Sequence, residues 1–322
     1  MNRYDIKDCD PVLRNDVREK GDAFHLDVNE TTFFKRQLEY VKTRTYDVKY
    51  KNLKAMQMIP ISTEMNPGAS SLVWYSFSQA GVAKIISDYA HDFPRVDVYA
   101  TENTIKPYDL GDSYGYSIRE VRQAAMAGQN LNSRRANTAR RAIDEKMDNL
   151  AWFGDSDYNI PGFFNYPGIT EYTVPNGAGG SKTWASKTAE EINADLIGIT
   201  DAISVPTKGR EEANQILLPR TQYNLAKNTK ITDDKTVLMW FMDNNTGVMV
   251  DPLDELVGQG AGGTDRFMAY VKDAEHLEQQ VPSPFEQLEV EKKGGEYVVP
   301  CMATYAGVTI YYPQSVAYGD GI

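Results

Sequence analysis

One stretch, residues 117–153, limits what this chain can fold into more than any other. Ser117 and Glu120 form a capping box, in which a hydroxyl and a carboxylate satisfy free amides of a first helical turn. No proline interrupts the stretch, and apolar residues recur at spacings of three, four or their sums. Gly154 follows, where a helix ends readily because glycine tolerates positive φ. The pattern predicts one uninterrupted helix, about 55 Å long.

The predicted helix is poor in large apolar side chains, because its middle contains mainly alanine, glycine, asparagine and arginine. We therefore expect a strut with a small-residue face, including Ala139 and Ala142, against a sheet and a basic face outward. The stretch holds seven basic and four acidic side chains. Its arginines have two open interpretations, a solvated face or ion pairs with neighbouring chains. The residues concerned are Arg134, Arg135, Arg140 and Arg141.

Charge and composition exclude several classes of protein. The 322 residues carry a net charge of −11, and residues 154–322 hold 12 basic against 24 acidic side chains. This balance argues against a general nucleic-acid binder, which needs a basic surface to replace counterions. Two cysteines are too few for a disulfide framework and indicate a reducing compartment. The first residues do not resemble a signal peptide, and no run of 18 apolar residues predicts a membrane span.

The N-terminal third predicts an arm and a ribbon. Residues 1–50 have ten basic and ten acidic side chains with weak periodicity, which indicates an extended arm that gains order from a partner. Strand-like residues 71–77 and 95–101 flank a distinct tip, residues 81–94, and so predict a long hairpin. A two-stranded ribbon is marginal alone, so it is expected to lie on its own core or on another subunit. The candidate intersubunit contacts are Trp74, Tyr75 and Phe77 in the ribbon and Ile85, Ile86, Tyr89 and Phe93 at its tip.

The remainder alternates between helix and strand signals, which predicts a compact α/β region over residues 170–280. Thr188 is a candidate helix N-cap, and the Gly-Gly at 294–295 indicates a hairpin. The 54–61 stretch looks strand-like, and the 236–244 stretch is buried but of uncertain type. The other expected elements are helices at 188–203 and 220–227 and strands at 213–218, 266–271 and 307–312.

No motif for catalysis, cofactor binding or metal binding stands out. The three histidines have no metal-ligand spacing, and no nucleophile or paired-cysteine motif is present. The glycine-rich residues 258–263 lack the Lys-Ser/Thr of a P-loop, so we interpret them as a mobile surface loop. Asp251, Asp254 and Glu255 could gather a cation, although three acids in a loop are usually solvated. We therefore expect no catalytic, cofactor or metal site, and no enzyme activity.

The predicted elements follow in the order arm, ribbon, long helix, aromatic turn, α/β region and closing strands. In this order the chain resembles the major capsid proteins of tailed bacteriophages, which share the Hong Kong 97 fold. The resemblance rests on four motifs: Tyr116-Ser117-Ile118-Arg119-Glu120 opening the helix, Trp152-Phe153-Gly154-Asp155 closing it, the turn Gly162-Phe163-Phe164-Asn165-Tyr166-Pro167-Gly168-Ile169, and the terminal stretch from Ala306-Gly307-Val308 to Tyr312-Pro313.

This resemblance implies an α+β fold with named parts. Residues 1–50 would be the N-terminal arm, and residues 51–169 with 281–322 the peripheral domain. That domain would include the extended loop, residues 70–110, and the spine helix, residues 117–153. Residues 170–280 would form the axial domain near capsomer centres.

The resemblance also implies a function and partners. Such proteins form hexamers and pentamers that close into an icosahedral shell around double-stranded DNA, with scaffolding and portal proteins as further partners. The packaged DNA would be contacted non-specifically, no membrane would be involved, and the protein would be found in the virion after assembly in the bacterial host cytoplasm.

Two alternatives remain open at this stage. One is an encapsulin-like nanocompartment shell protein, which shares the fold but encloses enzyme cargo. The other is an α/β enzyme with its site at a strand end. An enzyme needs a pocket with convergent polar groups, and no set of residues in the sequence nominates one.

Overall fold

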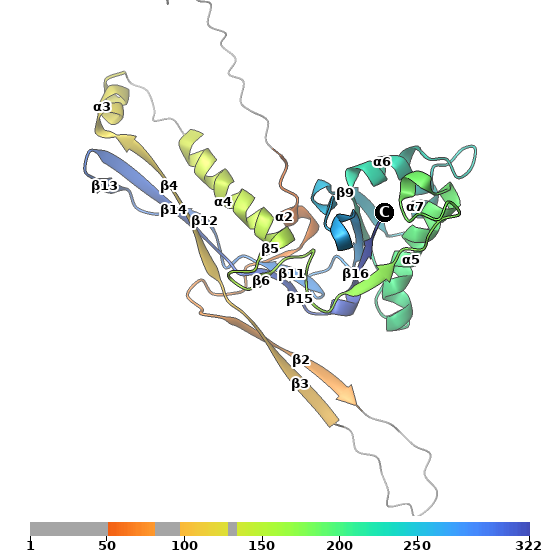
Figure 1. The fold of residues 1–322 in the computed structure, drawn as a ribbon. Coiled ribbons are helices and arrows are strands. Elements are labelled where there is room, and N and C mark those ends of the chain that lie inside the picture. The colour runs from red at the N-terminus through yellow and green to blue at the C-terminus, as the bar shows by residue number, and fades with distance from the viewer. Residues whose placement is uncertain (1–50, 81–96, 128–133) are drawn as a thin grey trace, which may run out of the picture. The chain divides into compact units, whose positions relative to one another are not determined.

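The computed structural model in Figure 1 combines helices with several sheets and describes residues 51–80, 97–127 and 134–322. The predicted arm, the whole predicted ribbon tip and six residues inside the predicted long helix lie outside the described residues. The description below concerns the unit that begins at Asn52. The mixed α+β class expected from the sequence is confirmed.

A strongly paired sheet joins two distant parts of the chain. Strand β4 (Tyr108–Ser117) pairs antiparallel with β14 (Glu296–Tyr305) along its whole length. The other edge of β14 carries β12 (Ser283–Gln287) and β13 (Glu291–Lys293). The hairpin predicted at residues 293–295 is the β13–β14 turn and is therefore confirmed.

The predicted 117–153 helix is two helices, α3 (Ile118–Ala127) and α4 (Arg134–Phe153). The capping box is confirmed, since the Ser117 amide donates to Glu120 Oε2 at 3.0 Å and the Glu120 amide to Ser117 Oγ at 3.1 Å. The prediction of one uninterrupted helix is wrong, because Arg135 Nη2 lies 2.9 Å from Glu120 Oε1. A straight helix would separate these positions by about 22 Å, beyond the reach of the two side chains.

Helix α4 lies along the β4–β14 sheet (Figure 1) and packs against it with a stripe of buried residues. Ala139, Ile143, Met147 and Leu150 are buried at helical spacing. The small-residue face was expected to include Ala142, and that expectation is wrong, because Ala142 is exposed. The packed stripe therefore passes through Ala139 but not through Ala142.

Paired tryptophan substitutions test this face. Ala139→Trp forces a large ring into a closed contact and is expected to lower the free energy of unfolding by about 1–3 kcal/mol. Ala142→Trp, three residues away on the exposed side of the same helix, is expected to change it by less than about 0.5 kcal/mol. Urea denaturation of both variants measures the difference, and equal stabilities would contradict the assigned face.

A tight aromatic turn follows α4. Strands β5 (Gly154–Asp155) and β6 (Ile160–Pro161) pair antiparallel. Phe163 and Phe164 are buried, and Phe164 stacks on Trp152 with ring centroids 5.1 Å apart. Asn165 closes the turn, because its Nδ2 donates to the Phe153 carbonyl at 3.0 Å and its Oδ1 accepts from the Gly162 amide at 2.7 Å. The compact apolar turn predicted from the sequence is confirmed.

A five-stranded sheet forms the centre of the second region, in the order β7-β16-β10-β8-β9. Its strands are β7 (Thr170–Thr173), β8 (Gln215–Leu218), β9 (Met249–Pro252), β10 (Arg266–Tyr270) and β16 (Val316–Asp320). Alternate residues of β10 enter different cores, with Met268 and Tyr270 in the core that includes α4, and Phe267 and Ala269 in the core of the helices described next. The sequence did not predict β16.

Three helices pack against this sheet. Helix α5 (Ala189–Thr207) begins with the predicted Thr188 cap, which forms a full capping box with Glu191. Helix α6 (Arg220–Asn228) matches its expected position, and α7 (Val237–Asn244) resolves the segment of uncertain type as a helix. Within the described ranges, no helix has the length and apolar character needed to cross a membrane.

A small sheet completes the fold, with β1 (Ile61–Ser62), β11 (Leu277–Gln280) and β15 (Gly307–Ile310). The strand-like 54–61 stretch instead begins with a short helix, α2 (Ala55–Met58). Asp148 of α4 explains the difference, because its Oδ1 accepts from the Lys54 and Ala55 amides at 3.0 and 2.8 Å. A buried carboxylate at a helix N-terminus satisfies amides that a strand would leave open.

Candidate assembly surfaces

The ribbon consists of β2 (Leu72–Ala80) and β3 (Asp97–Ile105), paired antiparallel with Leu72 opposite Ile105. One face contacts the chain's own body at the ribbon root. The Trp74 ring meets the Tyr311 ring edge to face, with centroids 5.9 Å apart. Trp74, a predicted intersubunit contact, thus has a partner within its own chain.

Tyr311 is itself fixed by a polar network. Its hydroxyl donates to Glu278 Oε2 at 3.0 Å, and Gln280 Nε2 donates to the same carboxylate at 3.0 Å. Burial and then the hydrogen bond and charge of Glu278 raise the pKa of Tyr311 well above its usual range. The phenol therefore stays neutral and donates its proton in the hydrogen bond to Glu278. This hydrogen bond holds the Tyr311 ring against the Trp74 ring.

The opposite face of the ribbon is apolar and exposed. Val73, Tyr75 and Phe77 alternate along β2, and Phe77 is 68% exposed. Val98 of β3 is on the same face, because the antiparallel register places residues 100, 102 and 104 opposite Phe77, Tyr75 and Val73. This exposed ribbon face is defined as Val73, Tyr75, Phe77 and Val98. Sequence reasoning named Tyr75 and Phe77 but missed the two valines, which only the register identifies.

The predicted contacts at the ribbon tip, Ile85, Ile86, Tyr89 and Phe93, lie outside the described residues.

The four candidate arginines do not form one free surface. Arg135 pairs with Glu120, and its guanidinium also lies 4.8 Å from the centre of the Tyr116 ring. The hydrogen bonds from Arg135 and from the Ser117 amide lower the pKa of Glu120. Arg141 pairs with Glu145 at 3.0 Å, and Arg140 lies 3.9 Å from Asp144. Arg134 is exposed at the start of α4. Three of the four arginines, Arg135, Arg140 and Arg141, thus lie near acidic side chains of the same chain, at positions that water reaches.

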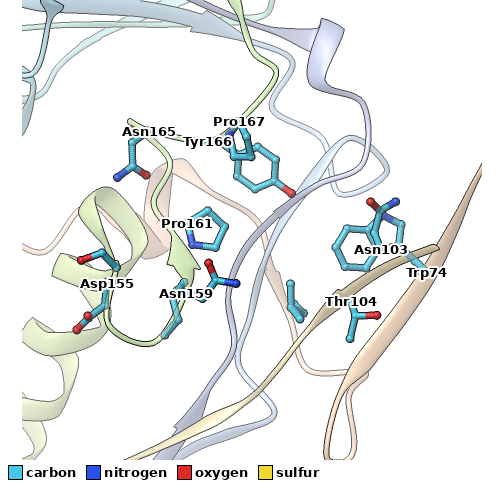
Figure 2. Close-up of a pocket in the computed structure, with 12 residues that line it drawn as sticks. Trp74, Asn103, Thr104, Asp155, Asn159, Pro161, Asn165, Tyr166 and Pro167 are labelled. Atoms are coloured by element: carbon cyan, nitrogen blue, oxygen red, sulfur yellow. The ribbon is translucent and has the colours of Figure 1, made fainter. Parts of the chain in front are cut away.

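A cavity of about 430 Å³ lies between the ribbon root and the aromatic turn, shown in Figure 2. Trp74 and Asn103 line it from the ribbon, and Asn159 and Tyr166 line it from the turn. The acid in the lining, Asp155, is 3.7 Å from Lys146. The lining is mainly amide, hydroxyl and ring, and its titratable side chains are Asp155 and Tyr166. Burial raises the pKa of Tyr166 and keeps its phenol neutral.

The glycine-rich loop at residues 258–263 is held by the chain's own carboxylates. The Gly258 amide donates to Asp265 Oδ1 at 3.0 Å, and the Ala261 amide donates to Asp320 Oδ2 at 2.8 Å. Burial opposes the charge on Asp320, yet the hydrogen bonds from Arg266 and Ala261 outweigh it and lower the pKa of this carboxyl. These amides therefore already bind anions that belong to the protein and are not placed for a phosphate.

Asp251 and Asp254, two of the three acids that the sequence suggested as cation ligands, interact with different side chains. Asp254 makes a bidentate pair with Arg220, with both contacts at 2.7 Å. Asp251 accepts from Gln215 Nε2 at 2.9 Å. Across residues 51–80, 97–127 and 134–322, no three His, Cys, Asp or Glu side chains converge as a metal site would require.

Comparison with known proteins gives the family. A model of the family described as "Major capsid protein" matches residues 81–322. A comparison with curated protein sequences found no significant match.

Solved structures give the fold. The chain is similar to the capsid protein in "The capsid of Myoviridae Phage XM1", with 19% identity, a TM-score of 0.75, and coverage of 91% of this chain and 99% of that one. It is also similar to a chain of the "Capsid of empty GTA particle", with 10% identity, a TM-score of 0.63, and coverage of 91% and 99%. A chain from Mycobacterium phage Bobi is 13% identical, with a TM-score of 0.59 and coverage of 88% and 94%.

At these identities the likeness to solved structures concerns the fold alone. The family model covers most of the sequence, from the ribbon tip through both core regions to the last strand. The chain therefore belongs to the major capsid protein family.

Proposed function

We propose that this major capsid protein builds the shell of a tailed phage by self-assembly into hexamers and pentamers that enclose double-stranded DNA. It would be a component of the virion, assembled in the cytoplasm of the bacterial host. Scaffolding and portal proteins would be its further partners, and contacts with the packaged DNA would be non-specific. The net charge of −11 favours weak contact with DNA, because a wall with few uncompensated cations releases few counterions.

The observation that carries the proposal is the exposed ribbon face. Tyr75 is 57% and Phe77 68% exposed, and the two valines beside them are also exposed. Contiguous apolar surface of this kind marks a contact site in soluble proteins. Because the opposite face already meets Tyr311 at the ribbon root, the ribbon is oriented with its apolar side outward. A neighbouring subunit is the partner that family membership supplies.

The proposed division into domains follows the sheets. Residues 51–169 with 281–322 would form the peripheral domain, and β4–β14 pairing between these two segments supports that assignment. Residues 170–280 would form the axial domain, with residues 1–50 as the N-terminal arm. We keep the tip residues Ile85, Ile86, Tyr89 and Phe93 and the four arginines of α4 as proposed intersubunit contacts.

A paired ribbon substitution tests the function. The Tyr75→Ser/Phe77→Ser variant is expected to keep the melting temperature of the unassembled subunit, because exposed side chains contribute little to stability. Shell formation by the variant should require at least about tenfold more protein, corresponding to about 1.4 kcal/mol per contact. Electron microscopy and sedimentation of the purified wild-type and variant chains measure both properties.

Tyr99→Ser is the matched control. Tyr99 is 61% exposed but lies on the ribbon face that carries Trp74, so its loss is expected to affect assembly less. Closed shells from the wild-type chain would support the proposal, whereas a monomer under all salt conditions would refute it. Shells filled with dense protein cargo would instead identify a nanocompartment. Normal shells from the double variant would remove the ribbon face from the proposal.

A further inference from the structure

Helix α3 presents a basic face that forms no ion pair with any other described part of the chain. Arg119, Arg122 and Met126 follow the i, i+3, i+7 spacing of one helix face, and all three are exposed, Met126 to 94%. Within the ranges that the structure describes, neither Arg119 nor Arg122 is in an ion pair, and the helix's own acid, Glu120, is taken by Arg135. We call Arg119, Arg122 and Met126 the basic patch.

The segment between β12 and β13 has the opposite character. Leu288 and Val290 are 43% and 60% exposed. Glu289 lies between them, and Glu286 precedes them near the end of β12. Both glutamates are exposed and make no ion pair among the described residues, whereas Glu291 nearby is paired with Lys293 at 2.9 Å. We call Glu286, Leu288, Glu289 and Val290 the acidic patch. Its two carboxylates are opposite in sign to the two arginines of the basic patch, and its two apolar side chains accompany the single methionine there.

The two patches lie at different positions along the β4–β14 sheet. The acidic patch follows the edge of β14, with Glu286 opposite Met302 and the Leu288 amide donating to the Pro300 carbonyl at 2.9 Å. The basic patch lies on α3, next to the sheet end where Ser117 pairs with Glu296. The Ile118 amide donates to the Gly295 carbonyl at 3.0 Å, so α3 starts beside the β13–β14 turn, as Figure 1 shows. The capping box and the Arg135–Glu120 pair fix the helix in place. None of the residues in either patch is part of the buried cores. The sheet therefore carries two complementary patches at separate positions, and both are exposed in the part of the chain that the structure describes.

We propose that the basic patch of one subunit docks on the acidic patch of a second copy of this chain. Two different patches that fit each other make a head-to-tail contact, and a set of such contacts closes into a ring when the rotation between copies allows it. The α3 end of one sheet would then meet the β12 edge of the next sheet around the ring. This inference rests on the proposed function, since it names the partner and the chemistry of one contact in the shell.

Other partners fit these patches less well. DNA would be attracted to Arg119 and Arg122 but repelled by Glu286 and Glu289 on the edge of the same sheet. The apolar members, Met126, Leu288 and Val290, call for a protein surface, and methionine adapts readily to one. A second copy supplies the matching charges and apolar groups together.

Charge reversal with rescue tests the contact. Arg119→Glu/Arg122→Glu and Glu286→Arg/Glu289→Arg each replace attraction by repulsion, and each is expected to raise the protein concentration needed for shells at least about tenfold. The combined four-residue variant restores both the net charge and the opposite signs across the contact. We expect the protein concentration that it needs for assembly to return to within about threefold of the wild-type value. The remaining difference in contact free energy would then be less than about 1.4 kcal/mol, which is the free energy of a tenfold change. Sedimentation and electron microscopy at fixed salt provide the readout.

Lys227→Glu/Lys230→Glu is the control for net charge, because it makes the same charge change on exposed residues near the end of α6. If a reversal variant folds poorly, the salt dependence of wild-type assembly is measured in its place. Salt at 1 M shortens the screening length to about 3 Å and should weaken the contact between the two patches. The Arg119→Gln/Arg122→Gln variant should then lose that part of the salt dependence.

The outcomes separate this contact from the proposed function. Wild-type shells, impaired single reversals and rescue in the combined variant would support the docking of the two patches. Wild-type shells with unimpaired reversals, or with a combined variant no better than either reversal, would overturn the docking and leave the shell function standing. Absence of shells from the wild-type chain would overturn both.

Discussion

Gly162→Ala is expected to lower the free energy of unfolding by about 3 kcal/mol or more, the upper end of overpacking effects. A Cβ atom at this position would clash with the Phe153 carbonyl carbon and with the Gly154 nitrogen. These are backbone atoms, so no change of side-chain rotamer relieves the clash. The β5–β6 turn would have to open, and with it the packing of Phe163 and Phe164 against Trp152. Urea denaturation of the unassembled subunit measures the loss.

Gly295→Ala is the matched control, because a Cβ there meets nothing within 4 Å and the backbone is not in the left-handed region. We expect it to change stability by no more than about 0.5 kcal/mol. If Gly162→Ala were as stable as Gly295→Ala, the close crossing of the two turn strands would not exist in solution.

The turn illustrates what the sequence could predict. Its Pro/Gly pairs and consecutive aromatic residues are local signals, and the helix caps at Ser117 and Thr188 are local as well. In each case, the hydrogen bonds join residues a few positions apart, so the pattern contains both partners. Elements with such local determinants were predicted close to their observed bounds.

The features that the sequence did not predict depend on distant partners. The capping and periodicity of residues 117–153 are compatible with one helix, and only the contact of Arg135 with Glu120 shows that α4 does not continue the axis of α3. Gly128, Asn130 and Asn132, which are weak helix formers, were the available signal. Similarly, β16 has its place because β10 and β7 provide edges for it, far away in sequence.

The candidate surfaces show the same division. The sequence identified the ribbon and its aromatic residues but could not assign them to faces. Trp74 differs from Tyr75 and Phe77 because Tyr311 meets its ring, and no pattern within residues 71–77 contains that information. The free charges of α3 and of the β12–β13 segment could be recognised only after the pairs Arg135–Glu120 and Lys293–Glu291 were known.

A buried ion pair joins the start of α5 to the segment before it. Lys187 Nζ lies 2.6 Å from Asp195 Oδ2, and both side chains are 1% exposed. The Trp184 indole also donates to Asp195 Oδ2, at 2.8 Å. Burial raises the pKa of Asp195, although the hydrogen bond and charge of Lys187 oppose that shift. Desolvation of both groups makes the pair a weak source of stability, but the loss of one partner leaves a buried charge.

Asp195→Ala is therefore expected to lower the free energy of unfolding by about 3–5 kcal/mol, because the Lys187 ammonium and the Trp184 indole lose their acceptor in the interior. The Lys187→Met/Asp195→Leu variant should recover most of this loss, since apolar residues of similar volume remove the charge as well as its partner. Asp243→Ala is the control, because Asp243 pairs with Lys235 at the same 2.6 Å but at the surface. It is expected to cost no more than about 1 kcal/mol. Thermal and urea unfolding of the three variants decide the matter, and equal losses in Asp195→Ala and Asp243→Ala would show that the Lys187–Asp195 pair is accessible to water.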